Sequence, residues 1–255
     1  MLRERLRSRM RDGEMLAGTF IKTPSIEVVE VLARAGLDFV ALDAEHAPFD
    51  RGRMDACLAI AKALDLPALV RVAAGEQSAI LQALDAGAVG VVVPHVDSTQ
   101  KATNVARWSR FGHGGRGYAG STRWAGYATR PMSEILEQSQ RETVVIAQIE
   151  EPEGVEDAED IAATEGLDGL FVGPADLSVC LGKSDLNSEA VTQAMSQVGR
   201  AAARHGKCFA TFSSNTESVA RLKDMGVTML FIASEQAFML SGAKTVVWNL
   251  TKSNE

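Results

Sequence analysis

Cysteine is scarce in this chain of 255 residues. The three cysteines, Cys57, Cys180 and Cys208, are odd in number and lie at no spacing typical of a metal or redox pair. This argues against a disulfide framework and against cysteine metal ligation. The simple expectation is a cytoplasmic protein whose thiols stay reduced.

Long apolar runs are absent as well. No stretch of about 18 apolar residues occurs, so we expect no membrane-spanning helix. The first residues, "MLRERLRSRMRDGEM", are basic but lack the apolar stretch of a signal peptide. Leu2, Leu6 and Met10 lie at helical spacing and predict an amphipathic N-terminal helix instead.

Positive charge is also in deficit. The chain has 26 Lys and Arg against 33 Asp and Glu, a net charge of −7, which argues against a nucleic-acid or anionic-membrane partner. Hydrophobic residues make up 46%, as in globular proteins. No Pro- or Ser-rich linker divides the chain, so that residues 1–255 are expected to form a single domain.

One pattern recurs along the chain: a helix-like segment, a glycine, and a short run rich in Val, Ile, Phe and Leu. "LARAGLDFVALD" and "LDAGAVGVVVP" are examples. The glycine suits the left-handed position that ends a helix, and the continuously apolar run suits a parallel strand buried on both faces. The glycines of this pattern are Gly36, Gly87, Gly166, Gly206 and Gly226.

Three further runs, "MLAGTFI", "LPALVRV" and "ETVVIAQIE", bring the expected strands to about eight, each followed by a helical stretch. This count and the chain length are typical of an α/β fold, the (β/α)8 TIM barrel, here with an N-terminal helix. The alternative is an open doubly wound sheet. A nucleotide-binding sheet of this kind is expected to have a glycine-rich motif after its first strand, and "GTFIKTPS" has none.

Nearly every predicted strand ends in a polar or reactive side chain. In a barrel, the carboxyl ends of the strands carry the reactive groups, so we expect these side chains to meet at one mouth. In chain order they are Asp43, Glu45 and His46 after the second strand, Arg71 after the third, His95 after the fourth, Gln148 and Glu150 at the fifth, and Asp176 after the sixth.

Alternation along the fifth strand strengthens this prediction. Gln148 and Glu150 share one face with two apolar residues of the same strand, so they point into the mouth if those residues fill the barrel. Glu150 and Asp176 then converge from neighbouring strands, and like charges so placed need a cation. Oxygen ligands suit a hard divalent ion such as Mg²⁺ or Mn²⁺.

Structural interpretations of the same residues stay open. Glu150 begins an acidic stretch that can decorate a helix N-terminus, and Asp176 can be an N-cap without a ligand role. Arg71 can pair with Asp43 structurally, and His46 can be a satisfied core histidine. The remaining histidines, His95, His113 and His205, are interpreted as structural.

Two further segments each allow two interpretations. The irregular stretch 110–131 contains Arg116, Arg123 and Arg130, which either recognise an acidic substrate tail or are solvated. The apolar C-terminal stretch "AFMLSGAKTVVWNL" either docks on a neighbouring subunit or forms the ordinary last helix of the barrel.

Several motifs, in order, resemble one enzyme family. They are "GTFIKTPS", "LDAEHAPFD", "LVRV", "GAVGVVVPHV", "GGRGYAGSTR", "QIEEPEGVEDAEDIA" and "LDGLFVGPADLS". They are similar to motifs of the HpcH/HpaI family of class II, metal-dependent pyruvate aldolases, such as 4-hydroxy-2-oxoheptanedioate aldolase and 2-dehydro-3-deoxyglucarate aldolase. The likeness runs from about Gly18 to Gly182. Beyond it, "IASEQAFML" stands where the family usually shows Gly-x-Asp.

The resemblance implies a lyase that cleaves or forms a 4-hydroxy-2-oxo acid, with pyruvate and an aldehyde as the small-molecule partners. The enolate would be stabilised by a divalent metal ion (Mg²⁺, Mn²⁺ or Co²⁺) held by Glu150 and Asp176. The substrate-binding residues it implies are Gln148, Gly173, Pro174, Ala175 and Asp176.

The resemblance also implies catalytic roles. His46 would be the general base, because removing a hydroxyl proton suits a group with a pKa near 7, and Arg71 would stabilise the enolate. In the family a carboxylate matching Asp85 raises the basicity of this histidine, whereas Asp43 is nearer in the sequence. Family members assemble as hexamers, so that a homo-oligomer is expected.

Competing functions make different demands on the sequence. A Schiff-base aldolase needs a lysine at a strand end, where only Lys22 lies. An acyl-CoA lyase of the citrate-lyase β type should show a basic surface for the nucleotide, and the acidic chain gives little sign of one. A non-catalytic metal-binding barrel would tolerate a broken metal pair, yet Glu150 and Asp176 are both present.

Overall fold

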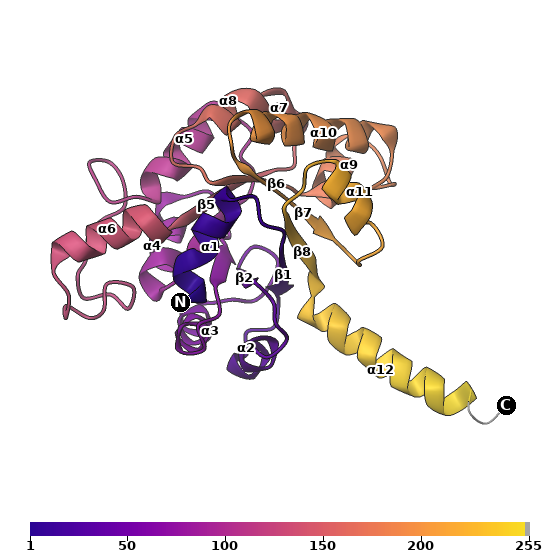
Figure 1. The fold of residues 1–255 in the computed structure, drawn as a ribbon, viewed down its shortest axis with the longest axis horizontal. Helices are drawn as coiled ribbons and strands as arrows, with labels where there is room; N and C mark the ends of the chain where they lie inside the picture. Colours follow the sequence, from indigo (N-terminus) through magenta and orange to yellow (C-terminus); the bar gives the residue numbers. More distant parts are fainter. Residues whose placement is uncertain (253–255) are drawn as a thin grey trace.

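The computed structural model describes residues 1–252, and its centre is a closed barrel of eight parallel strands (Figure 1). Each strand pairs with the next in the sequence, and β8 closes the barrel against β1. The predicted (β/α)8 barrel is confirmed. The strands are β1 (Leu16–Ile21), β2 (Phe39–Asp43), β3 (Ala68–Arg71), β4 (Gly90–Val93), β5 (Val144–Ile149), β6 (Gly169–Val172), β7 (Cys208–Ser213) and β8 (Met229–Ser234).

Helices surround the barrel and connect consecutive strands (Figure 1). All five glycines of the repeated pattern have positive φ angles between 61° and 111°, as expected of residues that end helices. The helices are α1 (Leu2–Arg11), α2 (Ile26–Leu32), α3 (Arg51–Ala63), α4 (Gln77–Ala86), α5 (Thr99–Trp108), α6 (Met132–Glu142), α7 (Pro152–Glu156), α8 (Ala158–Ala163), α9 (Pro174–Cys180), α10 (Glu189–Arg204), α11 (Val219–Asp224) and α12 (Glu235–Lys252).

Two apolar layers hold the barrel together. The larger lies between the strands and the surrounding helices. The smaller fills the barrel interior, where Phe231 contacts Phe39 and Phe171 edge to face at centroid distances of 4.8 Å. The predicted N-terminal helix is present as α1, and its Leu6 and Met10 belong to the inner layer. α1 therefore plugs the end of the barrel where the strands begin.

The irregular stretch 110–131 lies between α5 and α6. Helices of a barrel return the chain to the amino ends of the strands, so a segment that follows α5 starts at that end. A small apolar cluster that includes Trp124 and Ile135 anchors it there. The stretch is thus anchored at the amino end, and its Gly115 carbonyl oxygen accepts a hydrogen bond of 2.8 Å from the Gln77 side chain at the start of α4.

α12 projects away from the barrel (yellow in Figure 1). Its first residue, Glu235, is buried, but most of the side chains that follow are exposed. α12 is therefore not an ordinary covering helix of its own barrel. Among the helices of residues 1–252, none is long and apolar enough to cross a membrane.

Candidate active site

At the mouth, the ends of β2 and β3 bring a carboxylate and a guanidinium together. Asp43 and Arg71 are register partners on neighbouring strands, and both are buried. Arg71 donates from Nε to Asp43 Oδ1 at 3.0 Å and from Nη2 to Asp43 Oδ2 at 2.7 Å. Burial is the largest single influence and raises the pKa of the Asp43 carboxyl, but the Arg71 guanidinium, the His46 backbone N–H and the Lys22 charge together hold this pKa below its ordinary value.

Arg71 is held from two further sides. Its Nε lies 3.2 Å from Glu45 Oε2, and its guanidinium carbon lies 4.4 Å from the centroid of the Phe20 ring. Arg71 also lines the cavity of the mouth. A guanidinium fixed in this way presents a constant positive charge to an oxyanion bound in that cavity.

His46 lies beside this pair. Its backbone N–H donates to Asp43 Oδ1 at 3.1 Å, so Asp43 holds the turn that carries the imidazole. The ring Nε2 lies 3.6 Å from Glu45 Oε2. The side chain is 50% exposed and lines the cavity, which lets the ring exchange a proton with a molecule bound there.

Glu150 and Gln148 form the other side of the mouth. Glu150 is buried; its Oε1 accepts a hydrogen bond of 2.9 Å from the backbone N–H of His95, and its Oε2 accepts one from the Gln148 amide. A Cβ at Gly173 would lie 2.9 Å from Glu150 Oε2, so that a larger residue here would have to displace this carboxylate from its position. Gln148 Oε1 is buried without a hydrogen-bond partner among the described residues, as expected of an oxygen that binds a ligand.

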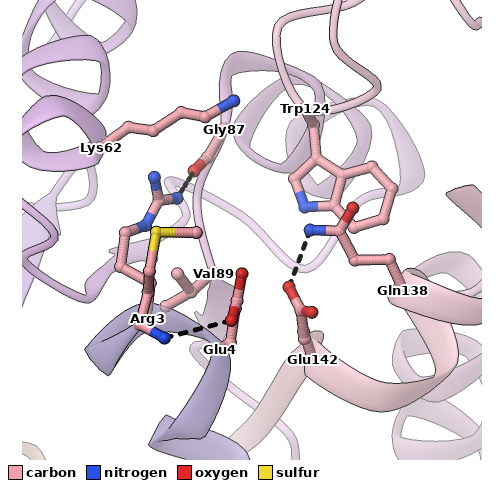
Figure 2. A pocket seen from close by; sticks show the side chains of 9 residues that line it. Arg3, Glu4, Lys62, Gly87, Val89, Trp124, Gln138 and Glu142 are labelled. Atoms are coloured by element: carbon pink, nitrogen blue, oxygen red, sulfur yellow. Dashed lines mark hydrogen bonds and ion pairs between the residues drawn. The ribbon is translucent and has the colours of Figure 1, made fainter. Parts of the chain in front are cut away.

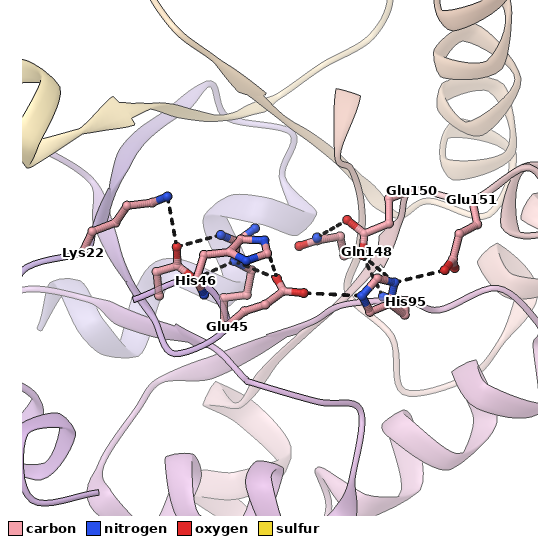
Figure 3. A network of polar contacts seen from close by, with 9 residues as sticks. Lys22, Glu45, His46, His95, Gln148, Glu150 and Glu151 are labelled. Atoms are coloured by element: carbon pink, nitrogen blue, oxygen red, sulfur yellow. Dashed lines mark hydrogen bonds and ion pairs between the residues drawn. The ribbon is translucent and has the colours of Figure 1, made fainter. Parts of the chain in front are cut away.

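Glu45 and His95 connect the two sides of the mouth (Figure 3). Glu45 Oε1 lies 3.5 Å from His95 Nε2, while His95 Nδ1 lies 3.3 Å from Glu150 Oε1 and 3.0 Å from Glu151 Oε1. Burial lowers the pKa of His95, but the three carboxylates raise it by more, so that this pKa lies above its ordinary value. Burial raises the pKa of Glu45, and the nearby Glu150 charge acts in the same direction.

Three residues at the mouth offer ligand atoms suited to a metal ion. One atom from each of Glu45, His95 and Glu150 lies within 4.8 Å of the other two. Asp176, which the resemblance pairs with Glu150, lies in the first turn of α9 with an exposed side chain. It lines the cavity but does not belong to this group.

The cavity at the mouth has a volume of about 270 Å³ and combines aromatic walls with charged groups. Such a volume suits a small organic molecule. Most predicted substrate-binding residues line it. The lining residues are Phe20, Lys22, His46, Arg71, Phe171, Gly173, Pro174, Ala175, Asp176, Phe212, Ser214, Ala233, Ser234 and Ala237.

The structure does not bring Asp85 to His46. Asp85 lies near the end of α4, at the amino end of the barrel, whereas His46 follows β2 at the carboxyl end. The Asp85 carboxylate accepts hydrogen bonds from Nε and Nη2 of Arg116 at 3.2 and 2.5 Å. Of the two predicted candidates, Asp43 is therefore the carboxylate that contacts the His46 turn within one chain.

The arginines of the stretch 110–131 do not line the mouth. Arg116 pairs with Asp85, Arg123 pairs with Asp55 at 2.7 Å, and the guanidinium of Arg130 donates to Gln138. The structure of one chain therefore does not support the interpretation that these arginines bind an acidic substrate tail at the mouth of the barrel.

A second cavity, of about 130 Å³, lies at the amino end beside this stretch (Figure 2). α1, the start of β4 and the end of α6 surround it, so it is remote from the carboxyl-end cluster. Its lining includes both signs of charge: Met1, Arg3, Glu4, Lys62, Gly87, Val89, Trp124, Gln138 and Glu142.

Sequence reasoning left Glu45 without a role and interpreted His95 as structural. One signal was available for His95, because it follows the end of β4 and so obeys the rule that located the other polar residues. A third residue, Glu235, lies in the segment "IASEQAFML", which departs from the family pattern. Its carboxylate accepts hydrogen bonds from the backbone N–H groups of Lys22 and Thr23 at 2.9 and 2.7 Å, which joins α12 to the end of β1.

Comparison with known proteins gives one family. The profile of the HpcH/HpaI aldolase/citrate lyase family matches residues 16–242. The hydroxypyruvate/pyruvate aldolase of Paraburkholderia phytofirmans is 33% identical over 247 residues, 94% of this chain and 94% of that protein. The 5-keto-4-deoxy-D-glucarate aldolase of Klebsiella pneumoniae is 34% identical over 208 residues, 81% of this chain and 80% of that protein.

Solved structures agree with this result. An HpcH/HpaI aldolase/citrate lyase family protein from Burkholderia cenocepacia superposes with a TM-score of 0.92 at 32% identity, covering 97% of this chain and 99% of that one. The citrate synthase SbnG gives 0.86 at 28% identity, covering 98% and 99%. The citrate lyase β subunit from Mycobacterium tuberculosis, at 19% identity and 0.58 over 89% and 94% of the two chains, shares the fold alone.

Proposed function

The chain belongs to the HpcH/HpaI aldolase/citrate lyase family and is a carbon–carbon lyase, and on this premise we propose that it cleaves a 4-hydroxy-2-oxo acid to pyruvate and an aldehyde. The same site would form this bond in the reverse direction. The observation that carries the proposal is that Arg71 and His46 line one small cavity beside the buried Glu150 and Gln148.

The residues of the mouth fit a divalent metal ion. Glu150 is a buried carboxylate, Gln148 Oε1 is a buried acceptor without a partner among residues 1–252, and Gly173 leaves room beside Glu150. Glu150 would hold the ion, with Asp176 as the second carboxylate that the resemblance implies. When bound, a divalent ion polarises the 2-oxo group of the substrate as a Lewis acid.

The protein side chains have separate tasks in the cleavage direction. His46 removes the proton of the C4 hydroxyl group, and C4 leaves as the aldehyde when its bond to C3 breaks. The electron pair of that bond moves to the 2-oxo group and produces the enolate of pyruvate. Arg71, which Asp43 holds in place, stabilises the enolate oxygen. The proton that His46 removed is returned to C3, which completes pyruvate and restores the base.

A second candidate function follows from the likeness to the citrate synthase SbnG. A citrate synthase joins carbon atoms rather than cleaving an aldol, so the chain should also be assayed with acetyl-CoA and oxaloacetate. Release of free CoA would favour this reaction. The cavity of about 270 Å³ favours the smaller aldol substrates.

Metal removal tests the proposal. EDTA is expected to abolish pyruvate release from a racemic 4-hydroxy-2-oxo acid, and Mn²⁺, Mg²⁺ or Co²⁺ is expected to restore it, because the enolate charge needs the ion. Pyruvate is measured by coupling to lactate dehydrogenase and NADH, with the coupling enzyme assayed separately in EDTA.

The matched variants are Glu150→Gln and Glu156→Gln, the second altering an exposed acid on α7. Metal should restore activity only to Glu156→Gln. Activity that survives EDTA would contradict the proposal. Irreversible inactivation by borohydride in the presence of pyruvate would do the same, since it would indicate a Schiff-base lysine, for which Lys22 is the candidate at the mouth.

A further inference from the structure

Two cations reach the cavity at the amino end of the barrel from different helices. Arg3 comes from α1 and Lys62 from the end of α3, and both line the cavity. Figure 2 shows their side chains beside Gly87, with Trp124 on the other side of the cavity. Within residues 1–252, neither cation forms an ion pair with a carboxylate.

The hydrogen bonds of the two cations go to backbone carbonyl oxygens instead. Arg3 Nη2 donates to the Gly87 carbonyl at 2.6 Å, and Lys62 Nζ donates to the Arg123 carbonyl at 3.2 Å. Arg3 Nε is buried and has no hydrogen-bond partner in the described part of the chain. Buried donors are nearly always paired, so Nε is a donor left open for a bound molecule.

The positive charge of Arg3 is only partly offset. Burial lowers the pKa of Arg3, and it does so by more than the charges of Asp65, Glu142 and Glu4 raise this pKa. Lys62 is more exposed, but partial burial lowers its pKa too, and the charge of Arg3 acts in the same direction. An anion bound between the two side chains would offset both charges.

The acids around the cavity already have partners. Glu142 is buried, and its carboxylate accepts hydrogen bonds from the side chains of Gln138 at 2.7 Å and Arg141 at 2.6 Å. Glu4 Oε2 lies 3.2 Å from the N-terminal nitrogen, and Asp65 accepts hydrogen bonds from two backbone N–H groups at the start of α1. The charge that lacks a bonded counter-ion in this cavity is therefore positive.

Another part of the wall is apolar. Val89 and the indole ring of Trp124 are buried and line the same cavity, whose volume is about 130 Å³. An inorganic oxyanion would leave this apolar surface without a contact. A small molecule with a charged head and a short hydrocarbon part would use both kinds of wall, as ligands of concave sites commonly do.

We propose that this cavity binds a small aliphatic carboxylate, with its anionic head between Arg3 and Lys62 and its apolar part against Val89 and Trp124. The site lies at the opposite end of the barrel from the mouth, so the inference does not rest on the proposed function. Because the ligand would contact both α1 and α3, its binding would stabilise the folded state.

The competing account is a cavity in which water alone solvates the two cations. The fluorescence of Trp124 distinguishes the accounts, because this ring lines the cavity. The chain has three tryptophans, so the double variant Trp108→Phe/Trp248→Phe leaves Trp124 as the single reporter. The full-length double variant is titrated at constant ionic strength with propionate, with its neutral analogue propionamide, and with inorganic phosphate.

Propionate is expected to change the Trp124 fluorescence with saturation and a Kd on the order of 1 mM, because its charge and its short chain both find contacts. Propionamide, which has the same shape without the charge, should give no saturable change. Phosphate should bind more weakly than propionate. Saturating propionate should also raise the Tm of the protein.

Variants made in the same background locate the site. Arg3→Gln should raise the Kd for propionate at least about tenfold, since it removes a charged hydrogen-bond donor. Lys62→Met should raise it about threefold or more, and this variant keeps the inference testable if Arg3→Gln fails to fold. Arg5→Gln, at an exposed arginine of α1 outside the cavity, is the matched control and should bind like the parent. Arg71→Ala removes a cation of the mouth and should keep the response.

A response that is absent, equal for propionamide, or unchanged in both Arg3→Gln and Lys62→Met would overturn the inference and favour the solvated cavity. Tighter binding of phosphate than of propionate would overturn the assignment of a carboxylate. Loss of the response in Arg71→Ala would place the ligand at the mouth and overturn the amino-end site. None of these results depends on pyruvate release, so the proposed function stands or fails separately.

Discussion

At the scale of the residue, the contacts of Arg71 fix the orientation of its guanidinium. Its bidentate bonds to Asp43, the contact with Glu45 and the Phe20 ring together leave it little freedom. A guanidinium supports this geometry and an ammonium does not, because only the planar fork makes two parallel bonds to one carboxylate.

The first prediction at this scale concerns proton exchange. Arg71→Ala should slow the exchange of pyruvate methyl protons in D₂O by about 100- to 1000-fold, the usual cost of losing one group that stabilises a developing oxyanion. Proton NMR of the methyl signal measures the rate, with metal present in excess.

Arg71→Lys separates charge from geometry in the same assay. It should recover only part of the rate, since lysine restores the charge without the bidentate bonds. Arg53→Ala, at an exposed arginine of α3, is the matched control and should exchange like wild type. An unchanged rate in Arg71→Ala would remove the assigned role.

At the scale of elements, α1 acts as a plug of the barrel. Leu6 and Met10 are buried in the inner apolar layer, which also contains Cys208 at the start of β7. Burial raises the pKa of the Cys208 thiol to about 11. The thiol is therefore both covered and protonated at the pH where an exposed cysteine reacts.

Loosening the plug should expose this thiol. Leu6→Ala is expected to lower the free energy of unfolding by about 2–5 kcal/mol, since it deletes a fully buried side chain. It should also accelerate the reaction of Cys208 with iodoacetamide. Cys57, whose pKa is also about 11 but which lies in the outer layer, is the internal control and should keep its rate. Mass spectrometry of the alkylated peptides reports both.

The raised pKa also fixes the direction of a pH effect. Between the unperturbed value of 9.0 and about 11, the unfolded chain loses the Cys208 proton while the folded chain keeps it. The contribution of this thiol to stability is therefore full below pH 9.0 and declines as the pH rises. Cys208→Ala should lose less stability than wild type over this interval in urea unfolding. Equal losses would show that folding does not raise the pKa of this thiol.

At the scale of the whole molecule, α12 exposes apolar side chains that the rest of the same chain does not cover. It has 18 residues and projects from the barrel, and its exposed apolar side chains include Phe238, Met239, Leu240, Val246 and Val247. An unpacked helix of this length is marginal in water. We therefore expect α12 to pack against a second copy of the chain, in a homo-oligomer that the resemblance implies to be a hexamer.

Charge placed on the apolar side of α12 tests this expectation. The double variant Leu240→Glu/Val247→Glu should shift the protein to a smaller species in analytical ultracentrifugation, because carboxylates are costly to bury in an interface. Lys244→Glu changes charge at a polar position of the same helix and should assemble like wild type. A wild-type protein that sediments as a monomer would refute the oligomer.

The pattern of the sequence was sufficient for the architecture. Buried parallel strands are apolar on both faces and glycines end the preceding helices, so composition and spacing alone predicted eight strands and the barrel. The same rule located Asp43, Arg71, Gln148 and Glu150 at the carboxyl ends, because every strand of a parallel barrel ends at one mouth.

Only the tertiary structure decided which of these groups meet. Local periodicity does not encode the conformation of the loops after the strands, and this conformation brings Glu45 and His95 against Glu150 while Asp176 stays outside their group. Local periodicity also does not show that Asp85 lies at the opposite end of the barrel, where it pairs with Arg116. The direction in which α12 leaves the barrel also depends on the backbone at the direct junction of Ser234 and Glu235, and no spacing in the sequence specifies it.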